Sequence, residues 1–127
     1  KDYYFLKMQK QIKIPFPSKD FAWFLGVLAG DGCAVNKKGQ YSISLQVTNK
    51  TFAEKFGEIG SNLFGIVFKW YVSNRSNKNK NWNVMYICRF NSKKVVEYLG
   101  DWKEEVWTTT LKEKFHWVIE NKSYISH

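Results

Sequence analysis

A pair of glycines inside an apolar helical segment constrains the fold of this chain more than any other feature. Ser18 is a typical helix-capping residue, and large apolar residues follow it at helical spacing, at Phe21, Phe24, Leu25 and Leu28. Gly26 and Gly30 lie four residues apart, on one face of this predicted helix, which is expected to stop at Gly32. A glycine inside a helix costs about 1 kcal/mol of stability relative to alanine. Close contact between two helices is the feature that usually offsets this cost. We therefore expect Asp31, at the helix end, to lie near its counterpart from a second copy.

Two hairpin-like regions alternate with predicted helices. Residues 33–37 are expected to pair with 41–48, in which polar and apolar residues alternate, and strands over 66–73 and 84–90 are expected to flank a polar loop. Helices are predicted from Thr51 to about Asn62, over 93–99 behind the cap Ser92, and over about 109–120. The order predicts an α+β fold with an αββαββα core, in which one four-stranded antiparallel sheet has helices on one face.

The net charge of +9 is unevenly distributed along the chain. Residues 66–94 hold seven Lys and Arg residues and no acid, and residues 33–50 also lack acids. Basic segments of this kind indicate a polyanionic partner, although a solvated lysine-rich surface is the alternative. No apolar run of about 18 residues is present, so the sequence gives no sign of a membrane partner. Cys33 and Cys88 are too few for a disulfide framework or a zinc site, and they are expected to be reduced thiols of an intracellular protein, cytoplasmic or organellar.

Alternation along the strands selects candidate DNA contacts on the uncovered sheet face. A twisted two-stranded ribbon fits the major groove, where Gln, Lys, Ser and Arg side chains read base edges. The candidates from both hairpins are Lys37, Gln40, Ser42, Ser44, Gln46, Lys69, Tyr71, Arg75, Asn83 and Arg89. Lys78 and Lys80 in the second loop are expected to touch phosphates. The phase of the last strand stays open, because both of its faces are partly apolar. The tryptophans are expected in the core, with Trp82 as the exception.

Residues 24–32, Phe-Leu-Gly-Val-Leu-Ala-Gly-Asp-Gly, resemble the signature of the LAGLIDADG homing endonucleases. The segment is identical to the signature at Gly26, Asp31 and Gly32, and it departs at Ala29, where the family usually has an acid. The run from Ser44 to Thr51 is also similar to the family, in which the second strand ends in a turn of this type before the next helix. The resemblance covers roughly residues 20–120 in the expected element order. It implies a saddle-shaped sheet, with residues 18–127 as the endonuclease domain and 1–17 as an N-terminal arm or short helix.

The resemblance implies an intron-encoded hydrolase, a Mg²⁺-dependent DNA endonuclease that cuts both strands of a long site. One motif per chain implies a homodimer and a roughly palindromic duplex target, with Gly26 and Gly30 at the dimer interface. A second motif beyond His127 stays open if the chain is a fragment. The alternative function is a LAGLIDADG-derived binding protein without cleavage, such as an intron-splicing maturase.

The resemblance also assigns roles around the metal. Asp31 and the main-chain carbonyl of Gly30 are expected to bind Mg²⁺, for which Mn²⁺ substitutes and Ca²⁺ binds without supporting cleavage. Asn49 is expected to position water, with a strand-ending turn as the alternative role. Lys112 is expected to stabilise charge on the phosphate, and Lys114 is its competitor.

Overall fold

The computed structural model describes residues 12–73, 84–103 and 105–120. Of the expected N-terminal arm, residues 1–11 lie outside the described part. Residues 12–17 form neither helix nor strand, and the Lys13 amide donates to the Phe64 carbonyl over 2.8 Å. This short segment therefore runs against the end of a helix rather than forming one.

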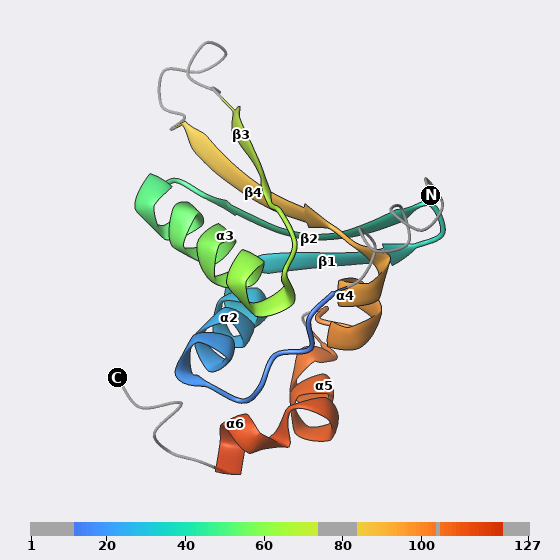
Figure 1. The fold of residues 1–127 in the computed structure, drawn as a ribbon. Coiled ribbons are helices and arrows are strands. Elements are labelled where there is room, and N and C mark those ends of the chain that lie inside the picture. Colours follow the sequence, from blue (N-terminus) through green and yellow to red (C-terminus); the bar gives the residue numbers. More distant parts are fainter. Residues whose placement is uncertain (1–11, 74–83, 104, 121–127) are drawn as a thin grey trace, which may run out of the picture.

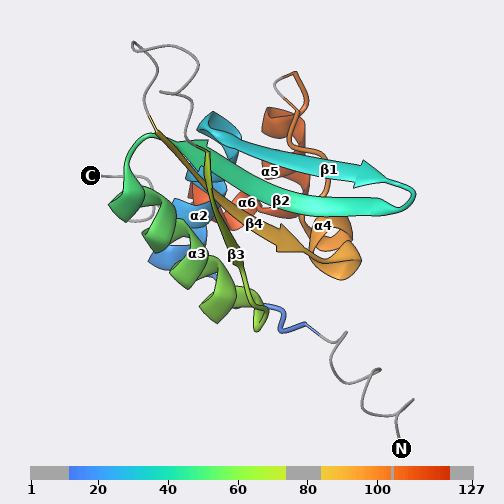
Figure 2. The same ribbon diagram turned by 90° about the horizontal axis from the view of Figure 1, so that it is seen from above.

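One four-stranded antiparallel sheet organises the fold, in the strand order β1-β2-β4-β3. Its strands are β1 (Gly32–Lys37), β2 (Gln40–Val47), β3 (Lys69–Ser73) and β4 (Met85–Asn91). The helices are α2 (Lys19–Gly30), α3 (Lys50–Phe64), α4 (Lys93–Leu99), α5 (Trp107–Lys114) and α6 (His116–Glu120). All of these helices lie on one side of the sheet, which leaves the other face without a helix in the described part of the chain (Figures 1 and 2). The predicted α+β class and element order are confirmed.

The core lies between the sheet and the helices, and aromatic rings fill it. Ile43 and Leu45 of β2 are each 1% exposed, and they pair with Phe90 and Cys88 of β4. The Phe24 ring of α2 stacks on Phe56 of α3 with centroids 4.5 Å apart, which ties the two helices together. Burying a side chain of this size stabilises the fold by about 1.5–3 kcal/mol. Truncation of Phe24 to alanine removes contacts with Phe56, Phe64 and Phe90 together.

Polar side chains set the first residues of three helices. The hydroxyl oxygens of Ser18 and Ser92 accept hydrogen bonds from the amides of Phe21 and Val95, and Asn49 does the same for Phe52 at the start of α3. Each cap satisfies an amide that has no partner within its own helix and stabilises by about 1 kcal/mol. The predicted caps at Ser18 and Ser92 are confirmed.

The structure corrects three expected boundaries. Helix α2 ends at Gly30 rather than Gly32, and β3 begins at Lys69 rather than at residue 66. The single helix expected over 109–120 is wrong, because Phe115 leaves the helical conformation with a ψ of 42° and separates α5 from α6. The Phe115 side chain is buried against Phe21, Tyr98 and Trp102, so packing into the core accounts for the break.

Candidate active site and nucleic-acid interface

The strand register gathers most of the predicted DNA contacts on the uncovered sheet face. Because β2 buries Ile43 and Leu45 toward the helices, its residues in the opposite phase face away from them. Cross-strand pairs then extend this face to the other strands: Lys37 with Gln40, Ser42 with Asn91, Ser44 with Arg89, and Arg89 with Lys69. We call this set the open face. It includes Gln46, and the backbone of Tyr71 pairs with Ile87. Arg75, Asn83, Lys78, Lys80 and Trp82 lie outside the described residues.

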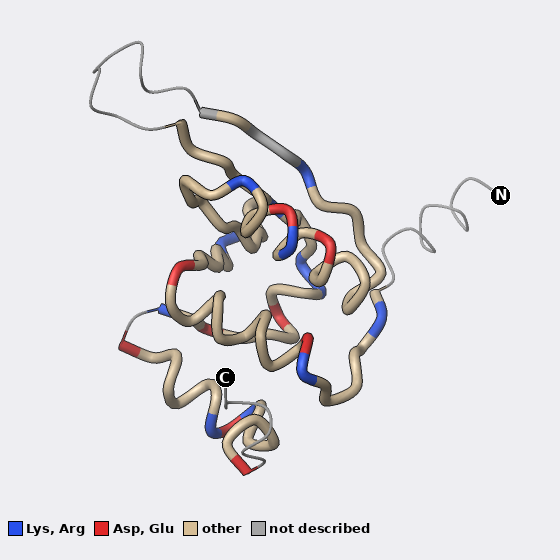
Figure 3. The backbone as a smooth tube through the Cα atoms, turned by 90° about the vertical axis from the view of Figure 1, so that its left-hand side faces the viewer, with Lys and Arg blue, Asp and Glu red and all other residues tan. Residues whose placement is uncertain are grey.

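The open face carries positive charge without acids in the part of the chain that the structure describes. The strands contribute Lys37, Lys69 and Arg89, whereas every described Asp and Glu lies on a helix or in a segment between elements (Figure 3). Carboxylates would repel phosphates at a nucleic-acid surface, so their separation from the sheet suits a polyanionic ligand. The acid-free segments predicted from the sequence therefore supply a sheet without acids, and the described acids belong to the rest of the molecule.

The register also identifies open-face residues that sequence analysis missed. Cys88 and Phe90 are buried toward the helices, so Met85, Ile87 and Asn91 belong to the open face with Arg89. The phase of β4 was left open because the strand is partly apolar in both directions. The signal that settles it is the pairing with β2, which joins residues far apart in the sequence.

Helix α2 leaves its glycine face uncovered. A Cβ added at Gly26 or Gly30 would meet no described atom within 4 Å, and both residues are exposed. Gly26, Gly30 and Asp31 border a groove of about 540 Å³, whose opposite wall comes from Trp102 and from α5 and α6. The helix–helix contact expected at these glycines is therefore not made by the described residues of one chain.

The wall of this groove is held in place by packing around Trp23. The Phe52 ring lies edge-on to Trp23 with centroids 5.6 Å apart, and the Lys55 ammonium sits 4.6 Å from the Trp23 centroid. Trp102 is buried, and its indole N–H donates to the Leu99 carbonyl over 2.8 Å. Trp23 and Trp102 both line the groove, which is thus a preformed apolar surface. The expected core position is confirmed for Trp102, whereas Trp23, Trp107 and Trp117 are partly buried and pack against the core.

Asp31 lies at the exposed C-terminal end of α2. Its backbone amide donates to the carbonyls of Val27 and Leu28, which ends the helix, and its carboxylate borders the groove. No three His, Cys, Asp or Glu residues come together anywhere in the described ranges. Burial in the core raises the pKa of the Cys88 thiol to about 12. One protomer thus offers a single carboxylate, with the carbonyls of the α2 C-terminus beside it.

A hard divalent cation prefers oxygen ligands of this kind, but it takes six or more of them. The ligands offered by one Asp31 and the end of one helix are too few unless other groups complete the shell. A second Asp31 and DNA phosphate oxygens have the required chemistry. The residues present fit a cation shared between two chains and a bound nucleic acid.

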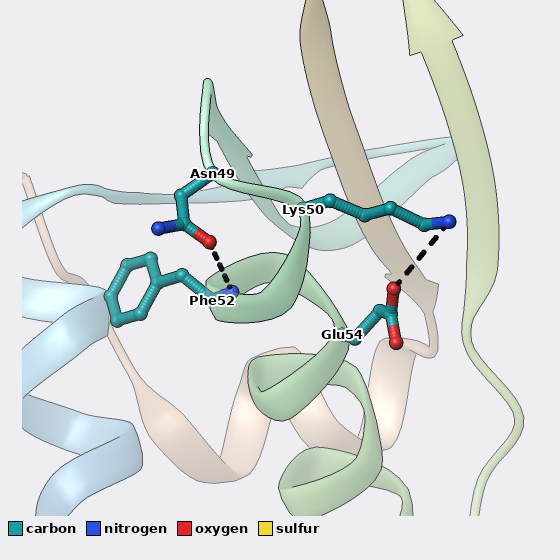
Figure 4. A network of polar contacts seen from close by, with 4 residues as sticks. All are labelled: Asn49, Lys50, Phe52 and Glu54. Atoms are coloured by element: carbon teal, nitrogen blue, oxygen red, sulfur yellow. Dashed lines mark hydrogen bonds and ion pairs between the residues drawn. The ribbon is translucent and has the colours of Figure 1, made fainter.

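Asn49 has a structural role that limits its chemistry. Its side-chain oxygen accepts the Phe52 amide over 3.0 Å, and next to it the Lys50 ammonium lies 3.9 Å from the Glu54 carboxylate (Figure 4). The alternative role of Asn49, a turn residue at the end of the strand, therefore takes the form of a helix cap. The amide nitrogen of Asn49 and the second lone pair of its side-chain oxygen are not used by the cap.

The structure separates the competing lysines of α5 by their surroundings. The Lys114 ammonium donates to the Glu97 carbonyl over 3.2 Å, at the C-terminal end of α4, where the helix dipole favours a cation. Lys112 is exposed and follows Leu111, which lines the same groove as Asp31. Lys103, which sequence analysis did not single out, directly follows the groove residue Trp102. Lys112 and Lys103 are thus exposed basic residues that directly follow groove residues in the sequence.

These features define a class: an α+β domain with one uncovered, acid-free sheet face and one uncovered helix face ending in an acid. The model of the LAGLIDADG-like domain matches residues 18–102, two thirds of the chain, and the chain belongs to this family. Helices α5 and α6 lie beyond the matched residues.

A curated relative is similar over much of the same region. It is the uncharacterized protein MJ0314 of Methanocaldococcus jannaschii, with 39% identity over 88 residues. The aligned region is 69% of this chain and 32% of that protein, so the chain spans about a third of the relative's length. In addition, none of the described helices is both long and apolar enough to cross a bilayer.

Proposed function

We propose that this chain is the nuclease domain of a site-specific, metal-dependent DNA endonuclease that acts as a homodimer. The observation that carries the proposal is the pairing of a lone exposed acid with an uncovered glycine face. Asp31 follows directly on the α2 face whose Gly26 and Gly30 meet none of the described residues. If two copies joined along this face, their Asp31 carboxylates would approach each other at the dimer axis. Like charges that close require cations between them, which supports a shared metal site.

The open face supports duplex DNA as the substrate. Its exposed Lys37, Lys69 and Arg89 supply phosphate and base contacts, and its polar strand residues are donors and acceptors for base edges. Two copies would present two such faces related by twofold symmetry, which favours a roughly palindromic target. Intron encoding and the compartment remain expectations from the family resemblance.

Each residue of the site has a definite task in this proposal. Asp31, with the carbonyl end of α2 at Gly30, binds Mg²⁺ or Mn²⁺, and the open face orients the phosphate beside it. A bound divalent ion makes hydroxide accessible at neutral pH and stabilises the departing oxygen. The Asn49 side chain orients the attacking water by a hydrogen bond. Lys112 places positive charge near the phosphate, and Lys103, which follows the groove residue Trp102, is a second basic candidate for this task.

Cleavage of a randomised duplex library in Mg²⁺ or Mn²⁺ tests this function, with Asp31→Asn as the decisive variant. We expect Asp31→Asn to lower the cleavage rate at least about a thousandfold, because metal binding supplies several kcal/mol of barrier reduction. DNA affinity should change little, since the open face is intact. Asp20→Asn, at the other end of the same helix, is the matched control and should cut normally. Sequence-specific binding without cutting by the wild-type chain would favour the maturase-like alternative, and cutting by Asp31→Asn would refute the mechanism.

A further inference from the structure

The open face has an apolar stripe on β4 that the core of the protomer does not require. Met85 and Ile87 alternate with the inward residues of a strand whose Cys88 and Phe90 fill the core. Both are half-buried on the side of the sheet opposite the helices, where no described element covers them (Figure 2). A polar residue at either position would leave the contacts of Cys88 and Phe90 unchanged. Among the described residues, the helix side of the sheet therefore does not require an apolar residue at these positions.

Polar residues surround this stripe on the neighbouring strands. Ile87 pairs with Gln46 of β2 and Tyr71 of β3, and Met85 pairs with Ser73. Further along β4, Arg89 pairs with Ser44 and Lys69, and Asn91 pairs with Ser42. The same strand therefore presents two apolar side chains followed by a cation and an amide. Such an order of side chains suits a ligand whose surface is apolar at one point and carries hydrogen-bonding groups at the next.

The major groove has a matching change of character. Guanine and adenine present acceptors and donors that suit Arg and Asn, whereas the C5 methyl of thymine is the apolar group on a base edge. Resting on the proposed function, we propose that Ile87, with Met85 beside it, contacts thymine methyl groups and selects T·A pairs. Arg89 and Asn91 then lie over the neighbouring pairs of the same half-site. Specificity at the stripe comes from a methyl contact rather than from a hydrogen bond.

Uracil substitution tests this proposal on the wild-type protein, because deoxyuridine lacks only the C5 methyl of thymidine. A target selected from a randomised duplex library is resynthesised with each thymidine in turn replaced by deoxyuridine. Replacement at one position of each half-site should weaken binding about fourfold per half-site, the effect of burying one methyl-sized group. Cleavage at subsaturating enzyme should fall by the same factor. If no thymidine can be replaced with a loss of twofold or more, the proposal is overturned.

A pair of variants assigns the effect to the stripe. Ile87→Ser should bind the thymidine and deoxyuridine targets equally, whereas Val72→Ser should keep the wild-type difference. Val72 is 62% exposed on the neighbouring strand but pairs with Tyr86, on the helix side of the sheet. A thymidine preference that survives Ile87→Ser would overturn the assignment.

These outcomes are distinct from those of the proposed function. Cutting of the thymidine target tests the nuclease, and the uracil comparison can be made by binding if the chain binds without cutting. A chain that cuts but ignores the methyl keeps its function and loses this inference. A chain that neither binds nor cuts any duplex selected from the library loses both.

Discussion

Helices α2 and α3 each carry two glycines, and the two pairs have opposite surroundings. A Cβ at Gly60 would lie 2.5 Å from Cζ of Phe90, and a Cβ at Gly57 would lie 2.7 Å from a ring carbon of Phe68. Beside Gly26 and Gly30 such an atom would meet nothing described within 4 Å. The glycines of α3 are needed for the helix to approach the sheet. Those of α2 allow no comparable close contact with the described residues of the chain.

The difference shows where the cost of each pair is offset. A glycine inside a helix destabilises it by roughly 1 kcal/mol relative to alanine. In α3 the close packing of Phe24, Phe68 and Phe90 against the helix compensates for this loss. In α2, Gly30 is the last helical residue and Gly26 lies inside the helix. The described residues supply no compensation at Gly26, which supports a partner that approaches the same face. The α3 glycines are therefore required for folding, whereas the α2 glycines are proposed to be required for dimer assembly.

The strongest test of this comparison is Gly30→Leu. A leucine would fill the space in which the second α2 is proposed to lie, so we expect the dimer dissociation constant to rise at least about a hundredfold, or about 3 kcal/mol. The protomer should remain folded, because the side chain projects into open space. Sedimentation and circular dichroism measure the two properties. Glu58→Leu, which adds the same side chain to an exposed position of α3, should leave assembly unchanged. A stable Gly30→Leu dimer would show that α2 is not the interface.

Gly60→Ala should have the converse effect. The added methyl meets the Phe90 and Phe24 rings inside the core, so we expect the free energy of unfolding to fall by about 2 kcal/mol. Association should be affected only through folding. Denaturant titrations at several protein concentrations separate unfolding from dissociation. Glu58→Ala, an exposed position of the same helix, is the control. If Gly60→Ala has normal stability, the Phe24 and Phe90 rings adjust without cost. The α3 glycines are then not required for packing, and the contrast with α2 fails.

The sequence was sufficient for features that depend on near neighbours. Helix starts at Ser18 and Ser92 follow from side chains three residues before the amides that they cap. The open face of β2 follows from strict alternation, and its neighbours follow from the short turn that fixes the register with β1. The position of Gly26 and Gly30 on one helical face also needs only helical geometry.

Features that depend on tertiary contacts could not be predicted. Phe115 breaks the last helix because its ring packs with Phe21 and Tyr98, which are distant in the sequence. The phase of β4 is ambiguous in the sequence because both alternating sets of its residues contain apolar side chains, so either set could face the core. Lys114 could be separated from Lys112 only through its contact with the Glu97 carbonyl, 17 residues away. The roles of Asp31, Asn49 and Lys112 remain predictions, since they depend on DNA, metal and a second chain.

The smallest expected effect gives the sharpest form of the comparison, because one substitution should change two properties in opposite directions. Gly26→Ala places a methyl in open space in the middle of α2, so we expect the monomer to gain about 0.5–1 kcal/mol of unfolding free energy from helix propensity. The same methyl would hold two α2 helices apart and weaken the dimer about tenfold. Unfolding is measured in the Gly30→Leu background, where association does not contribute, and assembly is measured in the wild-type background. Gly57→Ala, which meets Phe68, should destabilise the monomer instead. A loss of monomer stability on Gly26→Ala would mean that α2, like α3, keeps its glycines for the fold of a single chain.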